Sequence, residues 1–227
     1  MSPIPGVIAS AHVTTAAQAV RFDATADKYT RTANGLAGAF TWTWWVKLAS
    51  DRNTYSLMVC QDNASSTYYM MGTNVNGTTF SRSSVTNSAT HSFDFTVGTW
   101  TFCAAVNNTS GGDNIIGTHP VGGSWTALAA PGATTGPSDS NTFTIGQNGF
   151  GSQWVDGSIA AVKVWTVALT AAECQAERNF YAPVKTSGLW ASYSFRNGPQ
   201  TNDESGNGRT LTAAGTLTTD TSGPPIT

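Results

Sequence analysis

The segment FTWTWWVKL, residues 40–48, constrains the fold of this chain more than any other stretch of the sequence. Alternate side chains of a β-strand point to opposite faces. As a strand, this segment would have one continuously apolar face, made by Phe40, Trp42, Trp44, Val46 and Leu48. Such a face predicts a strand that lies between two stacked sheets. Trp45 shares the other face with threonines and a lysine, so we expect it on the solvent side or beneath a loop.

Short runs rich in Val, Thr, Ile and aromatic residues recur along the rest of the chain, between clusters of Gly, Asn, Asp and Ser. This pattern is typical of an antiparallel sandwich or barrel. We expect strands over residues 6–13, 19–22, 27–31, 40–48, 54–60, 66–72, 78–84, 91–95, 99–106, 114–119, 142–146, 157–166 and 188–195. The sequence shows no internal repeat and no linker that would mark a second domain.

One segment, LTAAECQAERNFYAP at 169–183, has a helical pattern. Thr170 is the expected N-cap, and Glu173 three residues later completes a capping box. The helix should end before Pro183, which cannot continue it. Glu173 and Glu177 lie one turn apart, and we interpret them as part of a solvated face rather than as a catalytic pair.

The composition excludes several classes of partner. Charged residues make up only 11 % of the 227 residues, against about 25 % in typical domains. The net charge is −2 and the 11 basic residues are scattered singly, which argues against nucleic-acid binding because that needs a clustered basic surface. No stretch approaches the roughly 20 apolar residues of a membrane span, so we expect no membrane insertion.

The N-terminal sequence MSPIPGVIASAHV has no basic region and places prolines where a signal peptide would be apolar. It therefore predicts no signal peptide. Cys60, Cys103 and Cys174 are odd in number and lack metal-site spacing. We interpret them as buried free thiols of a protein folded in a reducing cytoplasm. One disulfide with a leftover thiol is the alternative.

Several segments resemble the laminin-G-like branch of the concanavalin A-like lectin and glucanase jelly rolls. They are FDATADKYTR at 22–31, FTWTWWVKL at 40–48, VGTWTFCAAVNN at 97–108 and GSIAAVKVWTVALTAAECQAERNFY at 157–181. They occur in the order that the family has. The resemblance implies an all-β fold: a two-sheet antiparallel jelly-roll sandwich with one short C-terminal helix.

The same resemblance suggests domain boundaries. We assign residues 1–12 to an N-terminal arm or strand, 13–215 to the jelly-roll domain and 216–227 to a C-terminal tail. Residues 188–217 resemble the strand and Asp-x-Ser-Gly-Asn-Gly turn that usually come first in the family. Here they follow the helix, either as a permuted first strand or as an extra strand.

The chain departs from the family at positions that could bind calcium. Where the family often has Ile-Asp-Glu-Val, residues 159–162 read Ile-Ala-Ala-Val. The substitution removes oxygen ligands, of which Ca²⁺ usually takes six to eight. Asp23, Asp27 and Asp156 remain, and we assign each to a turn. We therefore predict no metal site and no cofactor, with calcium as the alternative.

The family fold also hosts β-glucanases, which hydrolyse glycosides with two carboxylates that flank the bond. The three glutamates of this chain lie in the helix and in the NDESGNG turn, and the two aspartates of FDATAD are separated by a turn. His12, His91 and His119 have no Gly-x-Ser-x-Gly nucleophile context. We expect no enzyme and no catalytic residue, and a glycoside hydrolase is the weakest alternative.

Glycan binding is the function that the family resemblance implies. It needs exposed aromatic rings with amide or carboxylate hydrogen-bonding groups on loops. The candidates are Trp45, Trp125, Trp154, Tyr68, Tyr69 and Asn148. Packing beneath a long loop is the alternative role for the tryptophan rings, since a fold alone does not establish sugar binding.

Low charge and abundant Thr, Ser and Asn suit an extracellular surface, although no signal directs export. Components of a virus particle meet both conditions, because they are made in the host cytoplasm and act outside. We therefore expect a structural and adhesion protein on a virion surface, a bacteriophage head decoration or tail accessory, with optional weak glycan binding. The alternative is a free carbohydrate-binding lectin module.

The N-terminal arm is the expected assembly element. Ile4, Val7 and Ile8 stand beside two prolines that resist regular structure, so the arm has little reason to order on an isolated domain. It would gain by lying across a neighbour, either another virion protein or a second copy of the chain. A homo-oligomer is the default expectation, and a trimer would suit three-fold positions of a particle.

Overall fold

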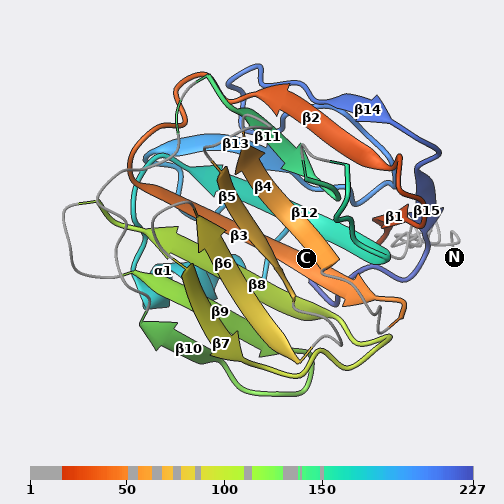
Figure 1. Cartoon of the computed structure of the whole chain (residues 1–227), viewed down its shortest axis with the longest axis horizontal. Coiled ribbons are helices and arrows are strands. Elements are labelled where there is room, and N and C mark those ends of the chain that lie inside the picture. The colour runs from red at the N-terminus through yellow and green to blue at the C-terminus, as the bar shows by residue number, and fades with distance from the viewer. Residues whose placement is uncertain are drawn as a thin grey trace, which may run out of the picture.

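A computed structural model describes residues 17–50, 56–62, 68–73, 78–84, 88–109, 114–129, 138, 140–148 and 151–226. These residues form two antiparallel sheets stacked face to face, with one short helix (Figure 1). The all-β sandwich expected from the alternation in the sequence is therefore confirmed. The predicted strand at 6–13 and the assembly candidates Ile4, Val7 and Ile8 lie outside the described residues.

The first sheet has eight strands and is called here the β3 sheet. Its order is β10 (Thr126–Ala129), β9 (Ile115–Pro120), β8 (Thr101–Asn107), β3 (Phe40–Leu48), β12 (Gly157–Trp165), β1 (Ala19–Phe22) and β15 (Thr218–Asp220), and β13 (Leu189–Tyr193) also pairs with β12. β1 pairs with the first part of β12 and β13 with its last part. Between them, Ala161 has a φ of 49°, which marks the break in pairing.

The second sheet has seven strands and is called the β4 sheet. Its order is β14 (Thr212–Ala214), β2 (Lys28–Thr32), β11 (Thr142–Ile145), β4 (Ser56–Asp62), β5 (Tyr68–Thr73), β6 (Thr79–Ser84) and β7 (Ser88–Ser92). Figure 1 views the sandwich through this sheet, with the β3 sheet behind it. The strands missed by the sequence pattern are β10, β14 and β15, which have only three or four residues each.

The core between the sheets is built largely from aromatic rings. Trp42 and Trp44 are fully buried in it, as the alternation of residues 40–48 predicts. The ring of Trp42 stacks on Phe40 at 4.4 Å and meets Phe143 of the β4 sheet edge-on at 5.7 Å. Burial of one such side chain contributes on the order of 2–3 kcal/mol, so this strand is a main source of the fold's stability.

A second apolar cluster lies on the outer face of the β3 sheet, beneath helix α1 (Ala171–Glu177). Trp45 belongs to it and is only 3 % exposed. Its indole N–H donates to the carbonyl of Arg178, the C-cap of the helix, at 3.1 Å. The expectation that Trp45 lies on the solvent side or beneath a loop is wrong, because the end of helix α1 covers it. Arg178, whose carbonyl accepts its N–H, lies 133 residues after Trp45 in the chain.

Helix α1 begins with the predicted capping box. The hydroxyl of Thr170 accepts the Glu173 N–H at 3.2 Å, and the Glu173 carboxylate accepts the Thr170 N–H at 3.0 Å. Glu177 contradicts the predicted solvated face. It is buried and forms an ion pair at 2.8 Å with Lys163, which also lies under the helix. Burial lowers the pKa of Lys163, and the adjacent carboxylate opposes that effect.

The segment expected as a C-terminal tail contributes to the β3 sheet. β15 pairs with β1, and Asp220 forms an ion pair with Lys47 at 2.7 Å. Beyond it, the Ser222 carbonyl accepts the indole N–H of Trp100 at 2.7 Å. The described part of this segment is therefore fixed along the sheet by contacts remote in sequence.

The three cysteines are free and buried, as expected. Burial raises the pKa of Cys103, and it raises that of Cys174 to about 12. Thiols in this state are protonated and unreactive near neutral pH. Among the described residues, no helix is both long and apolar enough to cross a membrane.

Candidate functional site

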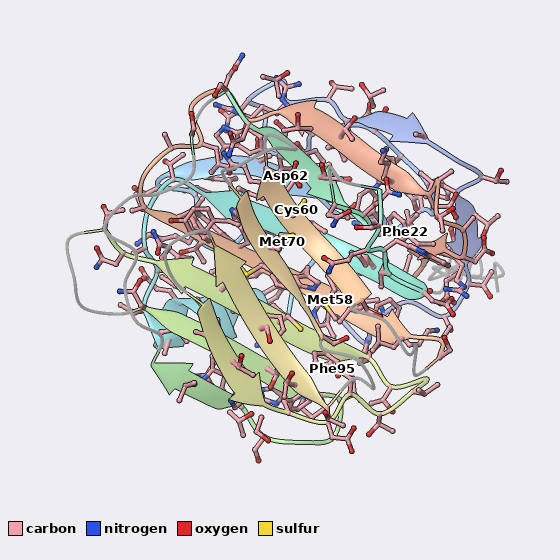
Figure 2. The ribbon with its side chains drawn as sticks, in the orientation of Figure 1. Phe22, Met58, Cys60, Asp62, Met70 and Phe95 are labelled. Atoms are coloured by element: carbon pink, nitrogen blue, oxygen red, sulfur yellow. The ribbon has the colours of Figure 1, made fainter. Side chains whose placement is uncertain are left out.

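The outer face of the β4 sheet carries polar side chains that are buried. Phe143 and Ile145 of β11 point into the core, so Thr144 between them points outward. Cys60 of β4 pairs with Thr144 and shares this face, and Asp62 follows two residues later. Figure 2 shows Cys60 and Asp62 toward the end of β4. Because these side chains are at most 1 % exposed, this part of the face is covered.

Part of the cover is the chain that follows β11. Gln147 and Asn148 are 3 % and 2 % exposed. The thiol of Cys60 lies 3.3 Å from an Asp62 carboxylate oxygen and 3.5 Å from the Gln147 carbonyl. A thiol is a weak donor to either acceptor. Gln147 thus lies against the outward side of β4 at Cys60.

Asn148 shapes this segment into a closed loop. Its side-chain oxygen accepts the N–H groups of Ser152 at 3.1 Å and Gln153 at 3.3 Å. Its own backbone N–H donates to the Gln153 carbonyl at 2.9 Å. An isolated bridge pairs Gln147 with Trp154 at the base of the loop. We call the described residues of this segment, 147, 148 and 151–154, the recognition loop.

Gln147 and Trp154 give the recognition loop its chemical character. The Gln147 amide N–H donates to the Thr25 carbonyl, whereas its side-chain oxygen is buried without a hydrogen-bond partner among the described residues. Buried polar atoms without partners are uncommon in native proteins. Trp154 is partly buried on the same loop. An amide oxygen and an indole ring together suit a sugar, which presents hydroxyl groups and apolar ring faces.

Two of the three calcium candidates, Asp27 and Asp156, serve structural roles. Asp27 is buried and accepts the N–H groups of Asp23, Ala24 and Thr216. Asp156 forms an ion pair with Arg21 at 2.6 Å. In the part of the chain that the structure describes, no group of three or more His, Cys, Asp or Glu could hold a metal ion.

The structure separates the aromatic candidates proposed from the sequence. Trp154 and Asn148 come together in the recognition loop, although Asn148 points into the loop and shapes it. Tyr69 is buried edge-on against Phe40 at 5.3 Å, and Trp45 is buried beneath α1, so neither ring can stack on a ligand.

Two further aromatic candidates have different positions. Tyr68 pairs with Asp62 in the register of β4 and β5, and its side chain lies outside the described residues. Trp125 lies on the outer face of the other sheet, over Gly117 of β9. The candidates therefore do not form one site.

Sequence reasoning missed Cys60, Asp62, Gln147 and Gln153 as members of this site. Cys60 lay at the end of the predicted strand, but Gln61 and Asp62 are both polar and gave no apolar alternation that would continue it. The predicted strand ended at residue 60. Nothing local in the sequence brings Gln147 to Cys60, which is 87 residues away.

This chain belongs to the concanavalin A-like lectin/glucanases superfamily, since the sequence profile of that family matches residues 22–175. No curated protein sequence matched the chain. The family assignment confirms the resemblance found in the sequence. It establishes a lectin or glucanase type of domain.

Solved structures share the fold at low sequence identity. A Bacteroides ovatus protein proposed to bind carbohydrate has a TM-score of 0.69 at 17 % identity, over 94 % of this chain and 62 % of its own. A heptameric SAP-like pentraxin from Limulus polyphemus has 0.59 at 14 %, over 91 % and 96 %. Tailspike protein 2 of an Escherichia coli O157:H7 bacteriophage has 0.54 at 13 %, over 74 % and 25 %.

These likenesses show the fold alone, because all of the identities are low. The chain spans about three fifths of the length of the Bacteroides protein and a quarter of the tailspike.

Proposed function

We propose that this chain is a non-enzymatic carbohydrate-binding and adhesion domain whose glycan site lies at the recognition loop. The observation that carries the proposal is the buried, unpaired side-chain oxygen of Gln147 beside the partly exposed Trp154. A sugar hydroxyl could satisfy that oxygen while the pyranose ring packs on the indole. Such a site has few polar contacts, so we expect weak binding.

The absence of catalysis is part of the proposal. Four described carboxylates form ion pairs within the fold: Asp156 with Arg21, Glu173 with Lys185, Glu177 with Lys163 and Asp220 with Lys47. A glycosidase instead needs two carboxylates free to flank a glycosidic bond. Purified protein should release no reducing sugar from laminarin, agarose, carrageenan or lichenan. Release that a single acidic substitution abolishes would contradict this part.

We also propose that the domain acts on the exterior of a virus particle, as a head decoration or tail accessory. The low charge and the Thr, Ser and Asn content support this placement, and the fold is one that a bacteriophage tailspike also uses. Deleting residues 1–10 should leave a folded sandwich that no longer self-associates in light scattering. An unchanged oligomer would contradict the role of the arm.

A free lectin module is the second candidate function. It is favoured by the similarity over most of this chain to a protein proposed to bind carbohydrate. The two candidates differ in location and assembly, and they share the glycan site. Mass spectrometry of purified particles from the source of the chain would separate them, because only a virion component would be present at a fixed copy number.

A glycan array with the full chain tests the site itself. Trp154→Ala and Gln147→Ala should each abolish the signals, because one removes the stacking ring and the other the hydroxyl partner. Phe180→Ala is the matched control, since it removes an exposed aromatic ring, 43 % exposed, far along the chain from the loop. An array profile that is unchanged in both loop variants, with native circular dichroism, would refute the recognition loop as a glycan site.

A further inference from the structure

A second aromatic surface lies on the outer face of the β3 sheet, where helix α1 does not provide all of the cover. It consists of Trp125, Phe102, His119 and Arg178 and is called here the Trp125 platform. Trp125, His119 and Arg178 are partly exposed, whereas Phe102 is buried at 1 %. The platform takes no part in the recognition loop, which lies on the β4 sheet.

The Trp125 ring rests on bare backbone. A Cβ atom at Gly117 of β9 would lie 2.3 Å from Cη2 and 2.4 Å from Cζ2 of the indole. Real Cβ atoms do not approach so closely, so only glycine at position 117 allows the ring to lie where it does. The six-membered ring of Trp125 is thus against β9, and the side chain as a whole remains partly exposed.

A positively charged side chain lies near the Trp125 ring. Phe102 lies at a centroid distance of 6.3 Å from Trp125, and it pairs with His119 in the register of β8 and β9. The His119 ring contacts the guanidinium group of Arg178. An aromatic surface and a cation therefore flank the same Phe102–His119 pair.

The Arg178 charge is not neutralised within the described residues. No described carboxylate lies within ion-pair distance of its guanidinium group. Glu177, the last residue of α1, is paired with Lys163 instead. Burial, and then the Arg178 charge, lower the pKa of His119, so the imidazole is neutral near pH 7. A backbone hydrogen bond at Gly123 opposes this lowering of the His119 pKa. The platform thus carries the positive charge of Arg178.

We propose that the Trp125 platform is a second carbohydrate site, specific for an acidic sugar. The pyranose ring would stack on the outward face of Trp125, and its carboxylate would pair with Arg178. A guanidinium group matches a carboxylate in planar, bidentate geometry, which gives the preference over neutral sugars. The proposal shares the carbohydrate ligand class with the proposed function and uses none of its residues.

The experiment follows the indole N–H signals of the full-length chain by NMR. Substitution of Trp125 and of Trp154 by Phe assigns the two signals. The protein is titrated with a galacturonic acid trimer and, separately, with the neutral galactose trimer. The Trp125 signal should shift with the acidic trimer at lower concentration than with the neutral one.

Three variants define the site. Trp125→Ala should weaken binding of the acidic trimer by about five- to tenfold, the range for loss of one stacked ring. Gly117→Ala should weaken binding of the acidic trimer to a similar extent, because its new methyl group displaces the Trp125 ring. This variant retains the tryptophan side chain. Arg178→Gln should weaken the acidic trimer and leave the neutral trimer unchanged. Trp154→Ala is the control and should leave the Trp125 shifts unchanged.

The outcomes separate this inference from the proposed function. Shifts of the Trp154 signal alone would overturn the second site and support the recognition loop. Shifts of the Trp125 signal alone would support the second site and overturn the recognition loop as a site. If neither signal shifts, both sites are refuted, and Trp125 only covers the glycine of β9, as aromatic rings do in other sheets. Equal binding of both trimers by wild type and Arg178→Gln would refute the preference for an acidic sugar.

Discussion

The two outer faces of the sandwich are covered in different ways. On the β3 sheet, helix α1 lies over an apolar cluster that contains Trp45, 3 % exposed, and the fully buried Trp165. On the β4 sheet, Gln147 of the recognition loop lies against Cys60, whose thiol also contacts the buried Asp62. A helix over apolar side chains contributes stability, whereas a loop over polar groups offers hydrogen bonds to a ligand. Under α1 the β3 sheet therefore has a second apolar core, whereas the cover of the β4 sheet is polar, as the proposed glycan site requires.

The central strands show the same contrast. β3 is buried along both of its faces apart from Lys47, so its outward threonines and tryptophan lie within protein. β4 also has buried outward side chains, yet these are a thiol and a carboxylate. The predictions below test whether the two faces differ in stability and binding as this comparison requires.

The largest expected effect is on the β3 sheet. Trp42→Ala and Trp45→Ala should each lower the free energy of unfolding by about 3–5 kcal/mol, because both rings are buried and leave cavities. Urea denaturation measures the change. Trp154→Ala on the recognition loop is the matched tryptophan control and should lower the free energy of unfolding clearly less. A small effect of Trp45→Ala would show that the helix does not complete a second core.

The second largest loss of unfolding free energy is expected at the buried ion pair beneath α1. Glu177→Ala leaves the Lys163 ammonium group buried without its carboxylate and should cost about 3 kcal/mol. The double variant Lys163→Met, Glu177→Met should recover most of this loss in the same urea experiment. If the double variant is as unstable as Glu177→Ala, the unpaired Lys163 charge is not the cause, and the loss comes from bonds of the carboxylate such as those from the Val184 and Lys185 N–H groups.

A smaller, pH-dependent effect is expected at the edge of the β3 sheet. Burial raises the pKa of Asp220, but hydrogen bonds from Lys47 and from two serine hydroxyls outweigh it and lower the pKa to about 2. An unfolded aspartate has a pKa of about 4. The Asp220 contribution is therefore fully present above about pH 4 and is lost as the pH falls toward 2.

The variant Asp220→Asn should cost about 1–2 kcal/mol at pH 7, after allowance for solvent screening. The difference in unfolding free energy between wild type and this variant should shrink as the pH falls from 4 to 2. A difference that stays constant over this range would show that the carboxylate charge is not what holds β15 in place.

The smallest effect is expected at the start of the helix. Thr170→Ala removes the side chain that caps α1 and should cost about 1 kcal/mol. It should leave glycan binding at the recognition loop unchanged, because the helix lies on the other face. Thermal unfolding and the glycan array together check both statements. Lost array signals would show that the two faces are coupled.

The sequence alone determined the features that depend on neighbours along the chain. The alternation of residues 40–48 predicted the inward face of β3, and the buried Trp42 and Trp44 confirm it. The Thr170 and Glu173 spacing predicted the capping box. Both patterns arise from the period of a strand or a helix turn, which a few adjacent residues specify. The family resemblance then indicated the two-sheet sandwich.

Which outward side chains are covered depends on how distant segments pack. Trp45 and Glu177 read as solvent-facing by local pattern, yet they are buried because α1 packs on the β3 sheet. Cys60 and Gln147 meet although 87 residues separate them. The strands β14 and β15 are too short to show a period and form because a partner edge supplies their hydrogen bonds. Contacts of this kind depend on how distant segments pack, and local periodicity carries no information about that packing.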